Sequence, residues 1–160
     1  MSSTVFRRLV QGDEAEARAF FADMGERSAG FFNVDKGNEK RTLEFFEGKR
    51  PDHVFYGLFE DGSLLALAFI WDVGRSVVWF GVAVRDGFQG RGFGKQITKG
   101  VLDECRADGH GGVLLRTHRD NIPAQKLYEA CGFEHIGTHN WQSKFAGSAW
   151  EYVEKFDEWY

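Results

Sequence analysis

Apolar residues recur along the chain in two different rhythms, and together these predict a mixed α/β protein. Positions spaced three to four residues apart predict helices over 12–25, 38–48, 92–108 and the stretch between Asn121 and Gly132. Alternating or continuous apolar runs predict strands over 4–10, 53–60, 63–73, 76–84, 112–118, 133–139 and 148–156. Segment 26–37 has neither rhythm and is expected to be irregular. The predicted fold class is α/β (α+β), with about six to seven strands flanked by about four helices.

The middle of the chain predicts the centre of the sheet. Asp61-Gly62 separates two apolar runs, which is the signature of a tight hairpin. Run 76–84 is apolar almost throughout, so we expect a central strand covered on both faces. Helix 92–108 carries an apolar stripe and is followed by another apolar run, 112–118. Strand, helix and strand then form a βαβ unit, whose two strands run parallel.

Residues with known positional preferences mark the helix ends. Asp13 is expected to cap the first helix, and Gly109 to end the third. Asn121 is expected to cap the short helix, with Pro123 in its first turn and Gly132 after its end.

Composition limits the classes of protein to which the chain can belong. With 160 residues, 42% of them hydrophobic, it is expected to form a single domain over 1–160. The formal net charge of −4 argues against a nucleic-acid partner, since such binders normally carry a basic surplus. The start of the chain lacks the apolar core of a signal peptide, and no run reaches membrane-spanning length. We therefore expect a cytoplasmic protein with no membrane partner.

The two cysteines, Cys105 and Cys131, have neither CxxC spacing nor a cluster of metal ligands beside them. Both fall in predicted helices among apolar residues, so buried reduced thiols are expected. No metal is expected.

The stretch QGRGFGKQ, residues 89–96, carries the strongest chemical signal in the sequence. Its glycines let the backbone approach a ligand, and the unpaired N–H groups of the helix that it opens suit a phosphate. Arg91 and Lys95 add positive charge. The P-loop pattern fails because Gly94-Lys95 is followed by Gln96. The dinucleotide fingerprint fails because Lys95 stands where its last glycine belongs.

A third pattern fits these residues. Residues 89–94 match Q/R-x-x-G-x-G/A, shortly after an apolar strand that ends in Val82-Ala83-Val84. Residues 121–133 match N-x-x-A-x-x-L-Y-x-x-x-G-F. In these two motifs, over the region 76–138, the sequence resembles the GNAT superfamily of acetyl-CoA-dependent N-acetyltransferases. The preceding order of a strand, two helices and a meander agrees with that fold.

The resemblance implies a GNAT fold whose sheet splays at its centre, with acetyl-CoA as co-substrate between the two parallel strands. A bulge in strand 76–84 would leave backbone groups of Val82 and Val84 able to bond the pantetheine arm. The pyrophosphate would lie on the backbone amides of the glycine-rich loop. The implied acetyl-CoA contacts are Val82, Ala83, Val84, Gln89, Gly90, Arg91, Gly92, Phe93, Gly94, Lys95, Asn121 and Ala124.

The reaction implied by the resemblance is direct attack of a primary amine on the thioester in a ternary complex. A backbone N–H near Val82 is the expected oxyanion donor, and Tyr128 stands where the family has its general acid. The general base stays open, because Val78 replaces a glutamate that many relatives carry and Arg116 replaces the glutamate of a peptide N-terminal pattern. The remaining candidates are Asp72, His118, Glu44 or a water relay.

Three functions remain open for such a chain. A small-molecule N-acetyltransferase is favoured, a peptide or protein N-acetyltransferase is the second, and a non-catalytic acetyl-CoA-binding regulatory domain is the third. By strand alternation, Arg116 shares a face with His118. It is expected either to clamp an acceptor carboxylate or to form a salt bridge with a neighbouring acid.

Residues 24–48 and the meander are expected to supply the acceptor wall, where aromatic groups would suit an apolar or cationic amine. The candidates are Phe31, Phe32, Phe45, Phe46, Trp71 and Trp79, with the acids Asp35, Glu39 and Glu44. By analogy with the family, a homodimer contact is expected from exposed aromatic residues of the last strand pair, namely Trp150, Tyr152, Trp159 and Tyr160.

Overall fold

The computed structural model describes residues 3–32, 37–141, 144–146, 149–151 and 155–160. The chain divides into two compact units, Met1–Val113 and Leu114–Tyr160. The expected single domain over 1–160 stays a prediction.

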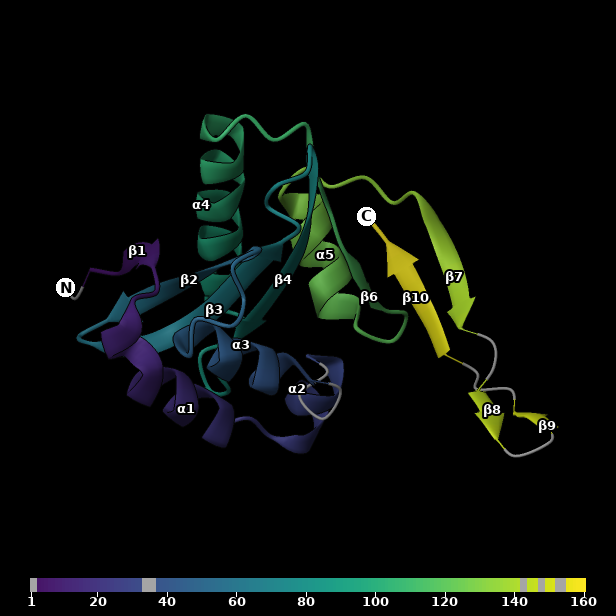
Figure 1. Ribbon diagram of the computed structural model, residues 1–160, viewed down its shortest axis with the longest axis horizontal. Helices are drawn as coiled ribbons and strands as arrows, with labels where there is room; N and C mark the ends of the chain where they lie inside the picture. Colours follow the sequence, from purple (N-terminus) through teal and green to yellow (C-terminus); the bar gives the residue numbers. More distant parts are fainter. Residues whose placement is uncertain (1–2, 33–36, 142–143, 147–148, 152–154) are drawn as a thin grey trace. The chain divides into compact units, whose positions relative to one another are not determined.

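A five-stranded sheet with the order β1-β2-β3-β4-β5 forms the middle of the first unit (Figure 1). Its strands are β1 (Val5–Arg8), β2 (His53–Glu60), β3 (Ser63–Trp71), β4 (Val77–Val84) and β5 (Gly112–Leu114). The helices are α1 (Glu14–Ala22), α2 (Glu26–Phe31), α3 (Glu39–Phe46) and α4 (Phe93–Ala107), with a 3-10 turn at Gln11–Asp13. The predicted helices and strands of this half are confirmed, and so is the hairpin at Asp61-Gly62, where Asp61 and Gly62 both have a positive φ.

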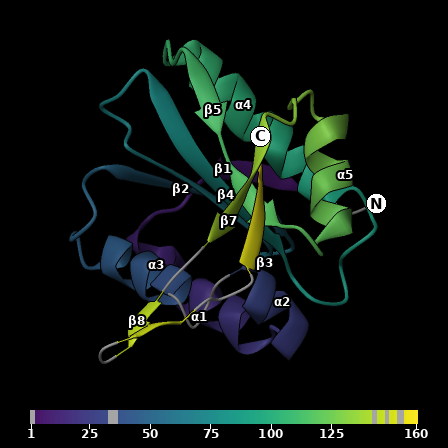
Figure 2. The same ribbon diagram turned by 90° about the vertical axis from the view of Figure 1, so that its right-hand side faces the viewer.

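Helices cover both faces of this sheet. α4 packs on one face, while α1, α2 and α3 lie together on the opposite side (Figure 2). On the α1–α3 side the core is strongly aromatic, with Phe20, Phe55 and Phe69 essentially inaccessible to solvent. On the α4 side, the predicted stripe is confirmed by the full burial of Ile97 and Val101. Each such side chain stabilises the fold by about 1.5–3 kcal/mol, so the two apolar layers hold the sheet in place.

β4 pairs with β3 along most of its length. The register is unbroken from Trp79 to Val84. The bulge predicted in 76–84 is therefore wrong for this pairing, and the register shift in the sheet lies instead between Leu58 and Phe59. Only Val78 and Phe80 of β4 are buried, and they share one face, while Val77 is exposed and the remaining residues are partly exposed, so the expected cover on both faces is wrong.

On its other side, β4 has a partner only at its beginning. Gly111 N donates to Ser76 O (2.7 Å) just before β4 and β5 begin. The two strands are neighbours from that point onward, so they run parallel, as the βαβ pattern predicts. β5 has three residues, whereas β4 has eight and continues to Val84. In the part of the chain that the structure describes, no other strand pairs with this edge of β4.

The open half of this edge presents particular backbone groups. Arg85 N donates to Leu65 O on β3 (2.8 Å). Because backbone groups alternate sides along a strand, the N–H and C=O of Val84 and Val82 point away from β3. The N–H and C=O groups of Val82 and Val84, which the predicted bulge would have exposed, are directed outward by the regular alternation of the strand. They lie beyond the part of β4 that is paired with β5, because β5 is short.

Two local expectations near the N-terminus are wrong. Segment 26–37 was expected to be irregular, but its first part forms α2, a short helix without buried residues. Asp13 was expected to cap the first helix, but its side chain makes no capping bond there. The carboxylate accepts instead from the Arg7 guanidinium (2.7 and 2.8 Å) and from Val10 N (2.8 Å). The Arg7 hydrogen bonds lower the pKa of Asp13, and they fasten β1 to the 3-10 turn.

The second unit contains α5 (Ile122–Ala130) and the remaining strands. These are β6 (Arg116–His118), β7 (Gly137–Trp141), β8 (Lys144–Ala146), β9 (Ala149–Glu151) and β10 (Lys155–Trp159). β10 lies between β6 and β7 and is antiparallel to both, while β8 and β9 form a separate pair.

The strand predictions for this half need three corrections. The predicted strand 112–118 is interrupted at Leu115, whose backbone exchanges two hydrogen bonds with Tyr160 (2.8 and 2.9 Å). The strand predicted over 133–139 begins only at Gly137, and the last strand is β10 rather than 148–156.

The expected dimer contact changes accordingly. Tyr160 is buried, with its hydroxyl donating to Glu129 (3.3 Å), and Trp159 is half-buried. Tyr152 and the side chain of Trp150 lie outside the described residues. The homodimer stays a prediction.

The cap of α5 is confirmed. The Asn121 side chain accepts from Ala124 N (3.4 Å), and Gly132 follows the helix with a φ of 91°. Cys131 lies just after α5, half-buried, rather than inside the helix. Cys105 is buried as expected, and burial raises the pKa of its thiol to about 11, so it stays a thiol at neutral pH.

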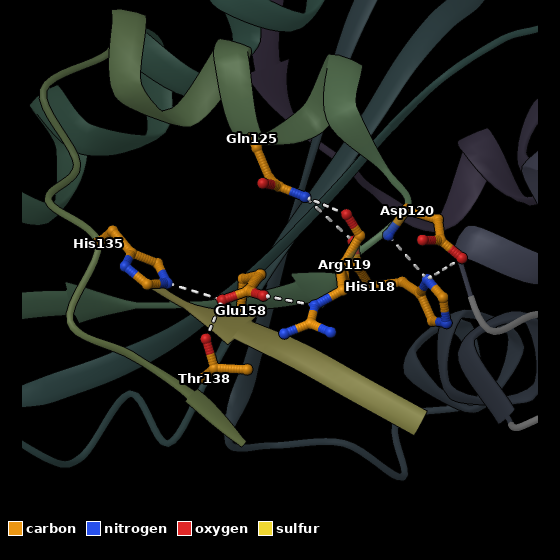
Figure 3. A network of polar contacts seen from close by, with 7 residues as sticks. All are labelled: His118, Arg119, Asp120, Gln125, His135, Thr138 and Glu158. Atoms are coloured by element: carbon orange, nitrogen blue, oxygen red, sulfur yellow. Dashed lines mark hydrogen bonds and ion pairs between the residues drawn. The ribbon is translucent and has the colours of Figure 1, made fainter. Parts of the chain in front are cut away.

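A buried carboxylate connects several segments of the second unit (Figure 3). Glu158 on β10 accepts from Thr138 Oγ1 (2.5 Å), from His135 Nε2 (2.7 Å) and from Arg119 Nε (3.4 Å). Its side chain is only 10% exposed. These hydrogen bonds, chiefly that from Thr138, lower the pKa of Glu158 below its ordinary value of 4.5. The carboxylate therefore joins β10, β7 and the loop before α5.

We expect Glu158→Gln to lower the free energy of unfolding of the protein by about 1.5–3 kcal/mol at pH 7, because bonds to a charged acceptor are lost. The pKa of Glu158 is lower in the folded state than in the unfolded state. The stabilisation is therefore fully present at pH values above the unfolded-state pKa, and it is lost as the pH falls through the folded-state pKa. Urea denaturation at several pH values measures both effects. Glu134→Gln, at an exposed position of the same unit, is the control and should change stability by less than about 0.5 kcal/mol. Equal stability of the wild type and Glu158→Gln at pH 7 would contradict a stabilising role of the hydrogen bonds to the Glu158 carboxylate.

Candidate active site

The glycine-rich loop opens α4 without any side-chain cap. Gly92 occupies the N-cap position with a φ of 86°, and Gly90 has a φ of 74°. Such left-handed values cost a non-glycine residue about 1–2 kcal/mol. The space beside both glycines is open, so their conformation, and not crowding, requires glycine. Since no side chain caps the helix, the first N–H groups of α4 have no intrahelical partner, as at anion-binding helix ends.

Positive charge lies next to this helix end. The Arg91 guanidinium lies 5.4 Å from the centre of the Phe88 ring and 5.2 Å from that of Phe93. Arg91 and Lys95 are both exposed, so their charges are available to a solvated anion. The loop residues predicted from the sequence are thus together, on one turn and its helix start.

The segment before the loop is fastened to α1 and α2 by three contacts that sequence reasoning missed. Arg85 pairs with Asp23 (2.6 Å), and Asp86 Oδ2 accepts from Gly25 N (2.7 Å) at the start of α2. Gln89 Nε2 donates to Ser28 Oγ (3.3 Å) and to Val84 O (3.2 Å). The side chain of Gln89 therefore organises the loop. No local pattern announces these contacts, because the partners lie about sixty residues apart in sequence.

The second motif lies in the second unit. Asn121, Ala124 and Tyr128 stand at the cap, the first turns and the last turn of α5. Tyr128 is buried and packs edge-on against Phe133, with ring centres 5.8 Å apart. Burial raises the pKa of the Tyr128 phenol well above its usual range, so the group is a neutral proton donor at physiological pH.

The base candidates differ in what surrounds them. Glu44 is bonded by Arg50 (2.7 Å) and lies 3.5 Å from Lys40, and the bond from Arg50 lowers the pKa of this carboxyl. This makes Glu44 a weaker base than an ordinary glutamate. His118 Nδ1 accepts from Asp120 N (3.1 Å), which places the ring proton on Nε2 in the neutral form. Asp72 is half-buried, with a φ of 61° after the end of β3.

Arg116 is exposed on β6, next to the buried Thr117. The expected strand alternation of Arg116 and His118 is thereby confirmed, and the role of Arg116 stays a prediction.

The aromatic residues proposed for the acceptor wall divide into two groups. Phe32 and Phe46 are core residues, while the others are only partly buried: Phe31, Phe45, Trp71 and Trp79. Trp71 and Trp79 stack across β3 and β4, with ring centres 5.8 Å apart. Glu39 is half-buried at the start of α3, and Asp35 lies outside the described residues.

Two further side chains lie on the same wall and were missed by sequence reasoning. The Arg41 guanidinium lies 4.7 Å from the centre of the Trp71 ring. His53 is buried and stacks on Trp71 from the other strand, at 6.3 Å. The spacing of Arg41 and Phe45, four residues apart on a helix, was the available signal that both face the sheet.

The described residues contain no group of three or more His, Cys, Asp or Glu side chains that could hold a metal ion. Nor do they contain a helix that is long and apolar enough to cross a membrane.

Residues 21–133 match the family model described as the acetyltransferase (GNAT) family. Mycothiol acetyltransferase from Beutenbergia cavernae is 34% identical over 138 residues, which cover 82% of this chain and 46% of that protein. N-alpha-acetyltransferase RimI from Mycobacterium tuberculosis is 28% identical over 102 residues, covering 61% of this chain and 63% of that protein. The chain thus spans less than two thirds of the length of these relatives.

The fold is shared with solved structures as well. An N-acetyltransferase from Staphylococcus aureus Mu50 superposes with a TM-score of 0.76 at 20% identity, covering 99% of this chain and 97% of that one. Fold, motifs and family model agree, and the chain belongs to the acetyltransferase (GNAT) family, whose members use acetyl-CoA as acetyl donor.

Gly92→Ala is expected to weaken acetyl-CoA binding at least about tenfold, because a Cβ disfavours the left-handed backbone that aims the first N–H groups of α4. Isothermal titration calorimetry with CoA measures the change. Gly109→Ala is the matched control, since Gly109 follows the other end of α4 with a φ of 79° and equally open space. That variant should lose similar stability yet bind CoA as the wild type does. Equal loss of affinity in both variants would remove the loop from the binding site.

Proposed function

We propose that this protein transfers the acetyl group of acetyl-CoA to a primary amine of a small molecule, by direct attack in a ternary complex. The observation that carries the proposal is the continuity of two features. The open edge of β4 offers outward backbone groups at Val82 and Val84. After four intervening residues the glycine-rich loop begins, and it leads into α4 at Phe93. A ligand with amide groups at one end and phosphates at the other suits this sequence of groups.

The residues fit the donor substrate in chemical type. The amides of the pantetheine arm find strand-like partners in the outward backbone groups of Val82 and in the N–H of Val84, and we assign Ala83, which lies between them, to the same contact region. The pyrophosphate finds the amides of Gln89, Gly90, Arg91, Gly92, Phe93, Gly94 and Lys95, with the two basic side chains beside them. We assign Asn121 and Ala124 to the same arm because they occupy the family's second motif.

The chemistry then needs few groups. The lone pair of the amine forms the C–N bond, the C–S bond breaks, one proton leaves the amine and one reaches the thiolate. The Val82 N–H stabilises the oxyanion that forms on the acetyl carbonyl. We assign protonation of the leaving thiolate to Tyr128, whose elevated pKa keeps the proton available at neutral pH.

A peptide or protein amine is the second candidate acceptor. It is favoured by the similarity to a relative named for an N-alpha amine, and opposed by Arg116 where the peptide pattern has a glutamate. A regulatory domain that binds acetyl-CoA without transfer is the third reading, and the retained Tyr128 opposes it. The acceptor panel below separates these possibilities.

Thiol release from acetyl-CoA should occur with one class of amine and fall by about 10²–10⁴ in Tyr128→Phe, because a general acid is removed while acetyl-CoA binding persists. The panel contains polyamines, aminoglycosides, amino acids, ω-amino acids, arylalkylamines and short peptides. Tyr160→Phe is the control, since it removes a half-buried hydroxyl of the same unit that has a structural partner. Tight CoA binding with no release for any amine would reject catalysis in favour of the regulatory reading. Release with peptides alone would move the assignment to the second candidate.

A further inference from the structure

Two rings and a guanidinium come together at the glycine-rich loop, from Phe88, Arg91 and Phe93. The Arg91 guanidinium lies 5.4 Å from the centre of the Phe88 ring and 5.2 Å from that of Phe93, and the two ring centres are 6.5 Å apart. Both distances from the guanidinium fall within the about 6 Å over which a ring attracts a cation. These three residues are called the aromatic clamp below. Phe88 stands just before the first sequence motif, which begins at Gln89.

The backbone of the loop brings the aromatic clamp together. Glycines with left-handed backbone stand on both sides of Arg91, namely Gly90 with a φ of 74° and Gly92 with a φ of 86°. The chain therefore changes direction before and after Arg91, and this allows residues 88, 91 and 93 to meet. Phe93 is the first residue of α4. The clamp thus holds a cation beside the helix end whose first N–H groups have no intrahelical partner.

Among the described residues, no carboxylate neutralises the cation of the clamp. No Asp or Glu oxygen of these residues lies within 4.0 Å of the Arg91 guanidinium, and the guanidinium donates no hydrogen bond to them. Asp86, the nearest acid in sequence, is engaged elsewhere: its Oδ2 accepts from Gly25 N (2.7 Å) and its Oδ1 from Gln89 Nε2 (3.3 Å). Arg91 is exposed, whereas the two rings are half-buried. The charge of Arg91 is therefore held by the rings and is open to an anion from solvent.

Aromatic rings hold a guanidinium differently from a carboxylate. A carboxylate accepts hydrogen bonds from the N–H groups, whereas a ring attracts the cation through its negative face and leaves the N–H donors unused. An arginine side chain without such support has considerable rotamer entropy to lose when a ligand immobilises it. Two rings that already restrict the side chain reduce this loss, because fewer rotamers remain to be frozen on binding. The clamp therefore keeps Arg91 charged, oriented and able to donate.

We propose that Phe88 and Phe93 are positioning residues for the acetyl donor, and that their rings hold the Arg91 guanidinium where a phosphate of acetyl-CoA accepts from it. The oxygens of a phosphate match the planar fork of a guanidinium, and the neighbouring N–H groups of α4 favour the same anion. The inference rests on the proposed function and deepens its donor site. It adds Phe88 to that site, and it gives the ring of Phe93 a role besides that of its backbone amide.

A ring beside the loop has one other use for the same ligand, which is to stack on its adenine. Such stacking needs a ring face, and the Phe88 ring already has the Arg91 guanidinium over it. The two roles also differ in what they require. The clamp affects ligand binding only while Arg91 is present, whereas stacking on adenine does not depend on Arg91. A double-mutant cycle separates the two roles.

The test is a double-mutant cycle between Phe88 and Arg91, with the Kd of CoA measured by isothermal titration calorimetry. Phe88→Leu keeps an apolar side chain without an aromatic face, and it should weaken CoA binding about threefold to fivefold. Arg91→Gln should weaken it at least about tenfold, because a charge-assisted contact to phosphate is lost. In the Arg91→Gln background, Phe88→Leu should change the Kd by less than about 1.5-fold. In the Lys95→Gln background, which removes a loop charge outside the clamp, Phe88→Leu should keep its full effect.

Further variants and a second ligand make the test sharper. Phe88→Trp restores an aromatic face and should bind CoA within about twofold of the wild type, whereas a side chain that only fills space would be replaced equally well by leucine. Phe93→Leu serves in case Phe88→Leu fails to fold, and its effect should depend on Arg91 in the same way. Dephospho-CoA, which lacks the 3′-phosphate, locates the contact. An equal effect of Arg91→Gln on both ligands assigns the pyrophosphate, and a smaller effect on dephospho-CoA assigns the 3′-phosphate.

Three results would overturn the aromatic clamp. An equal effect of Phe88→Leu with and without Arg91 means that the ring contacts the ligand itself. Unchanged CoA affinity in Phe88→Leu or in Arg91→Gln means that the guanidinium is not held for a phosphate. In these two cases a loss of affinity in Gly92→Ala leaves the proposed donor site standing without the clamp. Failure of the wild type to bind CoA at all rejects the proposed function, and the clamp with it.

Discussion

A backbone group that leaves a sheet must find another partner, and the outer edge of β4 is governed by this constraint. β5 has three residues, and beyond it no strand among the described residues pairs with β4 on the side to which the backbone groups of Val82 and Val84 are directed. Of these groups, Val84 O accepts from the Gln89 side chain. In most sheets such an edge invites aggregation or is covered. Here it runs into the glycine-rich loop, so an extended, amide-bearing ligand can complete the sheet.

Local sequence patterns were sufficient to predict much of the first unit's fold. The glycines of the loop, the stripe on α4 and the Asp61-Gly62 hairpin each have a cause within a few residues, and all three are found as predicted. α2 had no such cause, because it buries no residue and its start is held by Asp86 from a distant loop. The break at Leu115 was equally invisible, since it depends on the reciprocal backbone bonds to Tyr160.

The candidate site shows the same division. Tyr128 and the loop residues follow from motifs with fixed spacing, whereas the Arg41–His53 pair arises only when α3 is laid on β2 and β3. From the sequence, Glu44 was expected to be one of the acids that attract a cationic acceptor, but in the fold its carboxylate accepts a hydrogen bond from Arg50. The sign of a surface depends on which charges are already paired, and pairing across elements is set by tertiary structure. This is why acceptor chemistry is harder to predict than donor chemistry in this chain.

The contacts of Arg85, Asp86 and Gln89 with α1 and α2 bear on the coupling between two ligand-binding sites. The same loop that offers its amides to phosphate also holds the beginning of α2. If a ligand bound at the loop strengthens these contacts, it also orders α2. By thermodynamic linkage, ordering of α2 then raises the affinity of the loop for that ligand by the same free energy. For an acceptor that binds against residues 24–48, as the sequence analysis expects, binding of the donor at the loop and of the acceptor near α2 would be coupled through these contacts. A substitution at Asp23 or Ser28 would then change cooperativity between the two ligands.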